Sequence, residues 1–339
     1  MKKRMLAALL ALALCALPGC EKKPERVEFT TFAMDTVMNF TLYGDKDKCS
    51  AARSITGMIL SDYEAALSAT KEDSDISRVN RAGGQPVEIG SARLLERTLE
   101  LCAVTGGALD ITAYPAVKAW GFTTGEHRVP SDSELEELTR KIGYAAVKAE
   151  GDTVTLPAGM EVDLGAVAKG YVGDVLAGQI GLTSALLDLG QSTIVAVGAK
   201  PDGSPWRIGV VDPAQPGAYF AVVELEDTAM GTSGGYQRYF EEDGVTYWHI
   251  LDPETAAPAR SGLASVTVVS PSALTCDGLS TALFVMGLEE GAQFWRNHPE
   301  LDFEAVFVTE DGGIFCTAGL TDRFSLAEGY EDREVTVLE

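Results

Sequence analysis

The chain has 339 residues, of which 46% are hydrophobic and 23% are charged, a composition that fits an ordinary globular protein with a sizeable core. Its formal net charge of −23 at pH 7 argues against nucleic acid as a partner, because an acidic surface repels the phosphate backbone. Any anionic cofactor would therefore have to be held locally, by a metal ion or by backbone N–H groups.

Residues 1–19 predict an export signal. The basic stretch Lys2 to Arg4 precedes an apolar run over residues 5–17, which is shorter than the roughly 20 residues that a helix needs to cross a bilayer. The run ends in Leu17-Pro18-Gly19-Cys20, which resembles the lipobox at which bacterial lipoprotein precursors are cut. We therefore expect cleavage before Cys20 and a lipid on Cys20; the alternative is a plain secretory signal in which this cysteine is incidental.

Cleavage at this point would define the mature protein. We expect residues 20–27 to comprise the lipidated Cys20 and a polar tether, and residues 28–339 to form the folded domain. The lipid would hold the protein at the cell membrane, on its extracytoplasmic face, the periplasmic or outer-surface side. The remaining cysteines have no Cys-x-x-Cys spacing, and we interpret them as core thiols, with a disulfide as the alternative in an exported chain. They are Cys49, Cys102, Cys276 and Cys316.

The first half of the domain predicts one strand, three helices and a hairpin. Alternating apolar residues over 37–42 predict a strand that closes at Tyr43-Gly44. Apolar residues at three- to four-residue spacing predict helices. The predicted elements are a helix over 55–67, a helix from a Ser91 cap to Gly106, a helix from the Ser131/Glu134 capping box to about Gly143, and a hairpin over 147–156 that turns at Gly151-Asp152.

The second half is richer in strands. Its predicted elements are a helix from residues 165–170 through Ala177, strands over 185–189 and 193–197, a turn at Pro201-Asp202-Gly203, strands over 206–210, 247–251 and 265–270, a helix over 273–286 and a hairpin at Asp311-Gly312. Helices and strands interleave without a repeating βα period. We therefore predict an α+β fold with mixed sheets and packed helices.

Asp277 and Thr281 are candidate metal ligands. They lie four residues apart in the predicted late helix, so a carboxylate and a hydroxyl share one face and can bind a hard cation such as magnesium. The pair alone would also fit the solvent-facing side of a helix. Apolar residues at 279 and 282–285 favour a buried helix instead, in which an unpaired carboxylate is costly.

Residues 163–170, with the sequence Asp-Leu-Gly-Ala-Val-Ala-Lys-Gly, place an acid and a lysine around a small-residue turn. Glycines let backbone approach a phosphate closely, and Lys169 would add a positive charge. The alternative is an ordinary helix start with a surface lysine. The segment is not a Walker loop, because the GxxxxGK[ST] pattern is absent.

His249 is a candidate general base at the end of an apolar strand, although it could equally be a satisfied core residue. The absence of HExxH and of any Cys/His cluster argues against catalytic zinc. Residues 232–236, Thr-Ser-Gly-Gly-Tyr, offer hydroxyls beside a flexible turn. A serine hydrolase is nevertheless a poor interpretation, because the Gly-x-Ser-x-Gly pattern and a third partner are missing.

Taken in order, these segments resemble the ApbE-type FAD:protein FMN transferases over nearly the whole mature chain. Each motif alone is weak, but the ordered set is specific. The motifs are Met34-Asp35-Thr36, Ser74 to Asn80, Gly106 to Thr112, Trp120-Gly121-Phe122, Asp163 to Tyr171, Leu189 to Ser192, Thr232 to Tyr236, His249 to Pro253, and Asp277 to Ala282.

The resemblance implies an ApbE-like two-lobed flavin transferase fold and FAD as the substrate. It implies that the backbone oxygen of Ala166 binds Mg2+ together with Asp277 and Thr281. The family attaches FMN through a phosphoester to a threonine or serine of an acceptor protein, often an exported subunit of a redox complex. The implied FAD site comprises Met34, Thr70, Ala108, Leu109, Asp110, Asp163, Lys169 and Leu251.

A mechanism follows from what FAD presents. The metal held by Asp277 and the charge of Lys169 would neutralise the pyrophosphate and stabilise AMP as it leaves. His249 would take the proton of the acceptor hydroxyl, with Asp110 and Asp163 as alternative bases.

Two positions depart from the family pattern. Gly190-Gln191-Ser192 stands where many members have a second glycine, and Thr70 stands where several members carry an aromatic residue beside the flavin. Two alternatives to the transferase remain open: a magnesium-dependent FAD pyrophosphatase that releases FMN and AMP, and a non-catalytic FAD-binding lipoprotein.

Overall fold

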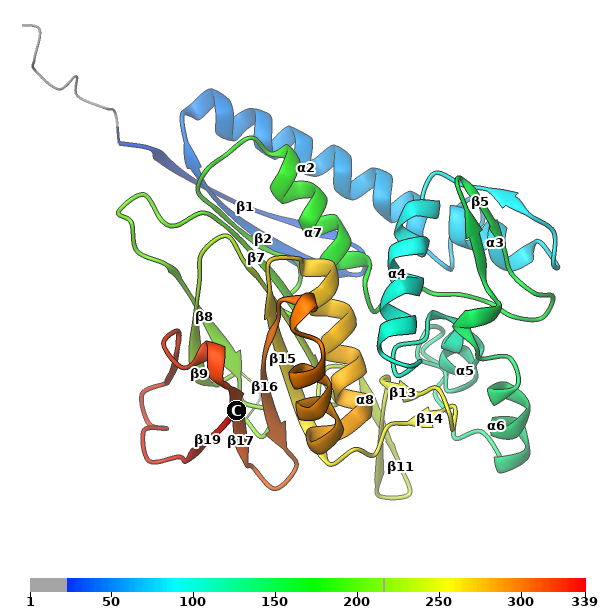
Figure 1. The fold of residues 1–339 in the computed structure, drawn as a ribbon. Helices are drawn as coiled ribbons and strands as arrows, with labels where there is room; N and C mark the ends of the chain where they lie inside the picture. The colour runs from blue at the N-terminus through cyan, green and yellow to red at the C-terminus, as the bar shows by residue number, and fades with distance from the viewer. Residues whose placement is uncertain (1–22, 216) are drawn as a thin grey trace, which may run out of the picture.

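A computed structural model describes residues 23–215 and 217–339, and a nine-stranded sheet forms its centre (Figure 1). Neighbouring strands are antiparallel except the last pair, β17 and β19, which is parallel. In sheet order the strands are β1 (Glu25–Ala33), β2 (Thr36–Gly44), β6 (Ala185–Asp188), β7 (Thr193–Val197), β10 (Ala229–Gly234), β15 (Leu263–Ser270), β16 (Glu304–Thr309), β17 (Ile314–Thr317) and β19 (Val335–Leu338).

The two faces of this sheet are covered differently. Helices α2 (Lys46–Leu67), α7 (Ala168–Gln179) and α8 (Ala273–Asn297) pack on one face and enclose the main hydrophobic core (Figure 1). A three-stranded sheet of β8 (Trp206–Val211), β9 (Tyr219–Leu225) and β18 (Phe324–Leu326) covers part of the other face, with a second apolar cluster between the sheets.

A smaller lobe lies beside the helical face. It contains α3 (Asp75–Arg81), α4 (Ala92–Val104), α5 (Tyr114–Ala119), α6 (Asp132–Thr139) and a sheet of β3 (Val87–Glu88), β4 (Lys148–Glu150) and β5 (Thr153–Thr155) (Figure 1). Two short hairpins complete the chain: β11 (Tyr239–Glu242) with β12 (Val245–Trp248), and β13 (Leu251–Asp252) with β14 (Ala257–Pro258). This architecture confirms the predicted α+β class.

Glycines, which have no side chain, let α8 approach both α7 and β10 closely. A Cβ atom on Gly170 would lie 2.2 Å from the carbonyl oxygen of Ala273, and one on Gly231 in β10 would lie 2.8 Å from the carbonyl carbon of Cys276. The carboxylate of Asp174 in α7 accepts hydrogen bonds from the N–H groups of Ala273 and Leu274, so it caps α8 where the helix dipole favours negative charge. The first turns of α8 are therefore fixed against both α7 and the sheet.

Most predicted elements are confirmed with shifted ends. The strand over 37–42 lies in β2, the helix over 55–67 lies in α2, and the hairpin at Gly151-Asp152 joins β4 to β5. The two strands over 185–197, the turn at residues 201–203 and the hairpin at Asp311-Gly312 are also present. The helix predicted over 273–286 continues to Asn297, with a break at Gly287, where φ is 82°.

Several local predictions are wrong. Ser91 precedes α4 without capping it, because its hydroxyl donates to Asp75 instead. Ser131 does accept a hydrogen bond from the N–H of Glu134, but that carboxylate pairs with Arg128, and α6 ends at Thr139 rather than near Gly143. The strand over 247–251 is divided into β12 and β13.

The N-terminal region differs from expectation in one respect. Glu25 and Arg26, which we expected in the tether, begin strand β1 and pair with Gly44 and Tyr43. The predicted signal and Cys20 lie outside the described residues. Among the helices that are described, none is both long and apolar enough to cross a membrane. The four cysteines of the predicted domain are buried, free thiols.

Candidate functional site

The carboxylate of Asp277, a residue of α8, lies beside the first turn of α7. The side chain is only 6% exposed. Its Oδ2 accepts a hydrogen bond from the backbone N–H of Gly170 at 2.7 Å, and its Oδ1 accepts one from the hydroxyl of Thr193 at 2.8 Å. Thus α7, α8 and β7 meet at one buried acidic group.

This arrangement changes the hydrogen bonding of the first turn of α7. In a regular helix the N–H of Gly170 would donate to the carbonyl of Ala166, four residues earlier. Because it donates to Asp277 instead, the Ala166 carbonyl accepts no hydrogen bond from any described residue. The segment before α7 therefore offers a carbonyl oxygen without a hydrogen-bond donor, and α8 offers a carboxylate; both atom types can bind a cation.

Thr281 adds a hydroxyl one helical turn beyond Asp277. Its Oγ1 donates to the carbonyl of Asp277 at 3.3 Å and lies 3.1 Å from the hydroxyl of Ser233 in β10. The structure therefore places the Thr281 hydroxyl beside Asp277, and a cation bound by Ala166, Asp277 and Thr281 stays a prediction of the resemblance. One acidic ligand with neutral oxygens fits Mg2+, which usually keeps positions for water and for substrate phosphates. Nowhere in the described ranges do three or more His, Cys, Asp or Glu residues form a metal site.

Burial sets the protonation of Asp277. Loss of solvent raises the pKa of its carboxyl to about 6, while the positive charge of Lys169 and the donors Thr193 and Gly170 lower it. A cation bound at this carboxylate would favour the ionised form further. Lys169, in the first turn of α7, forms no ion pair with any described residue, so its charge remains available to an anionic ligand.

His249 lies between β12 and β13 with one ring nitrogen anchored. Its Nδ1 lies 3.2 Å from the carbonyl of Arg238, which can only accept, so the neutral ring carries its proton on Nδ1 and keeps a lone pair on Nε2. Burial, reinforced by the charges of Arg238 and Lys169, lowers the pKa of His249 to about 4. The ring is therefore neutral at pH 7 and can accept a proton.

Arg238 contacts the candidate base His249, although no sequence motif singled it out. Its guanidinium donates to the carbonyl of Phe122, and its positive charge lowers the pKa of both Asp163 and His249. Burial has a larger and opposite effect on Asp163 and raises the pKa of its carboxyl. Arg238 stands outside every sequence motif and gives no local signal; its contact with His249 forms only when the chain folds.

The two alternative bases differ in their hydrogen bonds. Asp110 accepts from the N–H and hydroxyl of Thr112 and from the N–H of Tyr144, so both of its oxygens hold the surrounding turns. Asp163 accepts one bond, from the N–H of Gly165 at 2.8 Å. Asp163 thus retains more capacity to interact with a ligand.

The remaining residues of the implied FAD site are spread over several loops. Met34 lies in the β1–β2 turn with φ of 50°, and its N–H donates to Glu64. Leu109 and Leu251 are 3% and 7% exposed and pack in two different apolar clusters, so only their backbone could face a ligand. Ala108 is half-buried beside Leu109, whereas Thr70 is exposed in the loop after α2.

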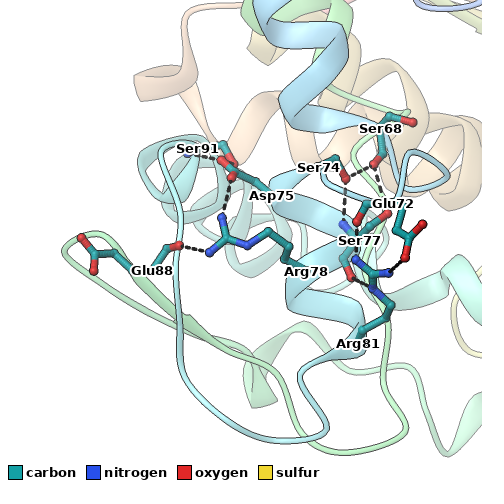
Figure 2. A network of polar contacts seen from close by, with 9 residues as sticks. All are labelled: Ser68, Glu72, Ser74, Asp75, Ser77, Arg78, Arg81, Glu88 and Ser91. Carbon is teal, nitrogen blue, oxygen red and sulfur yellow. Dashed lines mark hydrogen bonds and ion pairs between the residues drawn. The ribbon is translucent and has the colours of Figure 1, made fainter.

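The motif Ser74 to Asn80 holds two segments of this site in place, and Figure 2 shows its contacts with the first, at Ser68. Ser74 caps α3 and donates to the carbonyl of Ser68, and the hydroxyl of Ser77 donates to the carbonyl of Ala69. These bonds fix the loop that carries Thr70. The side-chain amide of Asn80 exchanges two hydrogen bonds with the backbone of Val162 and so fixes the residue before Asp163.

The same network ties α3 to the start of α4. Asp75 accepts hydrogen bonds from the N–H and hydroxyl of Ser91 and pairs with Arg78, whose guanidinium also donates to the carbonyl of Glu88 (Figure 2). The smaller lobe is therefore braced around the helix that positions the loop of Thr70.

Comparisons with known proteins show which family the chain resembles. The family model of the ApbE family matches residues 34–307. The FAD:protein FMN transferase of Vibrio cholerae serotype O1 is 35% identical over 298 residues, which cover 84% of this chain and 88% of that protein. The FAD:protein FMN transferase of Treponema pallidum is 32% identical and covers 93% and 94% of the two chains.

A solved structure shares the fold as well. The crystal structure of the ApbE protein from Thermotoga maritima superposes with a TM-score of 0.80 at 31% identity, over 91% of this chain and 100% of that one. The family model covers well over half of the sequence and the relatives span nearly its full length. The chain therefore belongs to the ApbE family.

Proposed function

We propose that this chain transfers FMN from FAD to a serine or threonine hydroxyl of an acceptor protein and releases AMP. The observation that carries the proposal is the hydrogen bond from the N–H of Gly170 to Asp277, which leaves the Ala166 carbonyl without a donor among the described residues. The relatives named FAD:protein FMN transferase support the same function.

The oxygen atoms of Ala166, Asp277 and Thr281 would hold Mg2+. Bound there, the ion would supply positive charge for the pyrophosphate of FAD. Lys169 would add a second positive charge from the first turn of α7. Neutralising the phosphates lowers their repulsion of a nucleophile and favours the departure of AMP.

The chemical step forms one bond and breaks another. The acceptor oxygen bonds to the phosphorus on the FMN side, and the bond from that phosphorus to the bridging oxygen breaks, so AMP leaves with the bridging oxygen. His249 Nε2 would take the proton of the attacking hydroxyl, because its ring is neutral at pH 7 and its Nδ1 is already engaged with Arg238.

The acceptor and the anchoring belong to the same proposal. The predicted signal and the lipidated Cys20 would place the enzyme on the extracytoplasmic face of the membrane, where an exported redox subunit with a serine or threonine acceptor could reach it. The basis is the sequence of residues 1–20.

A FAD pyrophosphatase is the second candidate, and one observation favours it. Thr70 is exposed and small, and its hydroxyl lies 3.1 Å from Ser68 rather than against an apolar surface. Water could then reach the pyrophosphate in place of the acceptor hydroxyl.

The deciding experiment incubates purified protein with FAD and Mg2+, with and without a candidate acceptor that carries a serine or threonine flavinylation motif. Transfer predicts an FMN-sized mass gain on the acceptor together with AMP. AMP with free FMN and no mass gain would identify a pyrophosphatase. FAD binding without AMP in either reaction would contradict both activities.

A further inference from the structure

One of the two hydrogen-bond donors to Asp277 is a threonine that lies outside the motifs of the family resemblance. Thr193 begins β7, is fully buried, and donates its hydroxyl to Oδ1 at 2.8 Å, while the N–H of Gly170 donates to Oδ2 at 2.7 Å. Each carboxylate oxygen has two lone pairs, so one donor on each leaves both oxygens able to bind a cation. Both donors are neutral, so neither of them compensates the negative charge.

The sheet holds Thr193 in a fixed position. Its carbonyl accepts from the N–H of Leu189, and the residue pairs with Gly231 of β10. A Cβ atom on Gly231 would lie 2.8 Å from the backbone of Cys276, so the sheet and α8 are in close contact beside Thr193. The pairing of β7 with β10 and the contact of β10 with α8 therefore hold the Thr193 hydroxyl against Asp277.

We propose that Thr193 is a positioning residue for the cation site. Its hydroxyl fixes the rotation of the Asp277 carboxylate, so that the lone pairs not used by Thr193 and Gly170 face the cation. The inference rests on the proposed function in placing a cation at Asp277. Hydrogen-bond partners of ligating side chains typically change metal affinity by about 10- to 100-fold when they are removed.

The test measures binding of Mn2+ alone, by electron paramagnetic resonance of the free ion, in four purified proteins besides the parent. Thr193→Val and Thr193→Ala should bind at least about 10-fold more weakly, whereas Thr193→Ser should stay close to the parent. Thr267→Val is the matched control, because it loses a buried strand hydroxyl that contacts Thr232 instead of Asp277. It should bind as the parent does.

The Ser and Ala variants decide the matter even if Thr193→Val does not fold, because both lack the methyl group and differ only in the hydroxyl. Parental affinity in Thr193→Ala would overturn the proposal. An equal loss in Thr193→Ser and Thr193→Ala would also overturn it, since the effect would then come from the methyl group. A parent protein that binds no Mn2+ would overturn it together with the cation site. If the variants show the expected ranking of Mn2+ affinities but the parent transfers no FMN, the positioning role of Thr193 is supported and the proposed transferase function is contradicted.

Discussion

At the scale of single residues, the protonation of His249 follows from its neighbours. Arg238 and Lys169 are both cationic, and with burial they keep the ring neutral at pH 7. His249→Ala should therefore lower kcat by about 100-fold or more, the usual scale for losing a positioned base, with a smaller change in the Kd for FAD. AMP release and FAD titration measure the two quantities. Equal losses in binding and turnover would assign His249 a structural role.

Arg238 should control the pKa of that ring. Protonation next to a cation is unfavourable, so Arg238→Gln should raise the pKa of His249 from about 4 toward 6.5. The return is expected to be partial, because burial and Lys169 remain. NMR titration of the ring resonances, assigned with His249→Ala, provides the measurement, and an unchanged pKa would contradict the assignment. The depressed pKa also means that His249 contributes a loss of stability as pH falls from 6.5 to 4.

Sequence motifs at this scale predicted Asp277, Thr281, Ala166 and Lys169 as site residues. The structure shows that Thr281 bonds to the carbonyl of Asp277 and that the charge of Lys169 lowers the pKa of Asp277, while their roles stay a prediction. The motifs could not identify Thr193 or Arg238, because neither stands in a motif and each acts through a contact made only in the folded chain. The Thr193 to Asp277 bond spans 84 residues, and no local pattern encodes such a contact.

At the scale of elements, the contact of α7 with α8 depends on Gly170. Gly170→Ala would place a methyl group 2.2 Å from the carbonyl of Ala273, and overpacking against backbone typically costs about 1–3 kcal/mol. Gly178→Ala in the same helix is the control, because its Cβ atom meets nothing within 4 Å, and the change should be neutral or stabilise by up to about 1 kcal/mol. Urea unfolding of both variants gives the comparison. Equal free energies of unfolding would show that α7 and α8 move apart at Gly170 without a measurable cost.

The loop after α2 should set the balance between transfer and hydrolysis. Ser74 and Ser77 hold this loop through hydrogen bonds to the carbonyls of Ser68 and Ala69, so a side chain at position 70 has a defined place. Thr70→Tyr should reduce AMP release in the absence of acceptor while transfer continues, because a ring can stack on the flavin and exclude water. Thr70→Val, small and without a ring, should hydrolyse as the parent does. Unchanged hydrolysis in Thr70→Tyr would mean that water is excluded elsewhere.

Elements with strong periodicity were predictable, and elements that depend on pairing were not. α4 was found because its apolar residues recur at helical spacing and are buried together. β1 was missed at its start because Glu25 and Arg26 are exposed and polar, and only the pairing with β2 makes them strand. The backbone conformation of Gln191 was not predictable either. Its φ is 67°, in a region that glycine adopts more easily.

At the scale of the whole molecule, a metal that binds only the folded state should stabilise the fold. Ligand at 100 times its Kd contributes about 2.7 kcal/mol. Mg2+ should therefore raise the Tm of the parent protein, and EDTA should reverse the shift and abolish both transfer and FAD cleavage. Asp277→Ala should show no Mg2+-dependent shift and no activity. A shift of equal size in Asp277→Ala would place the metal elsewhere.

The acidic composition explains why such a site must be local. With a net charge of −23, the molecule as a whole repels the pyrophosphate of FAD. Lys169, the start of α7 and the bound cation would then supply the attraction within a few residues. Net charge and composition argue against a nucleic-acid partner, but they could not locate this site.

The bond from Gly170 to Asp277 also dictates an order of events during synthesis. It joins residues 107 positions apart, and Asp174 likewise waits for the N–H groups of Ala273 and Leu274. A nascent chain that ends before α8 contains all of α7. It lacks Asp277, which accepts the hydrogen bond of Gly170, and the N–H groups that bond to Asp174. Since chains emerge from the N-terminus, the oxygen site is completed only when the last long helix has left the ribosome and docked.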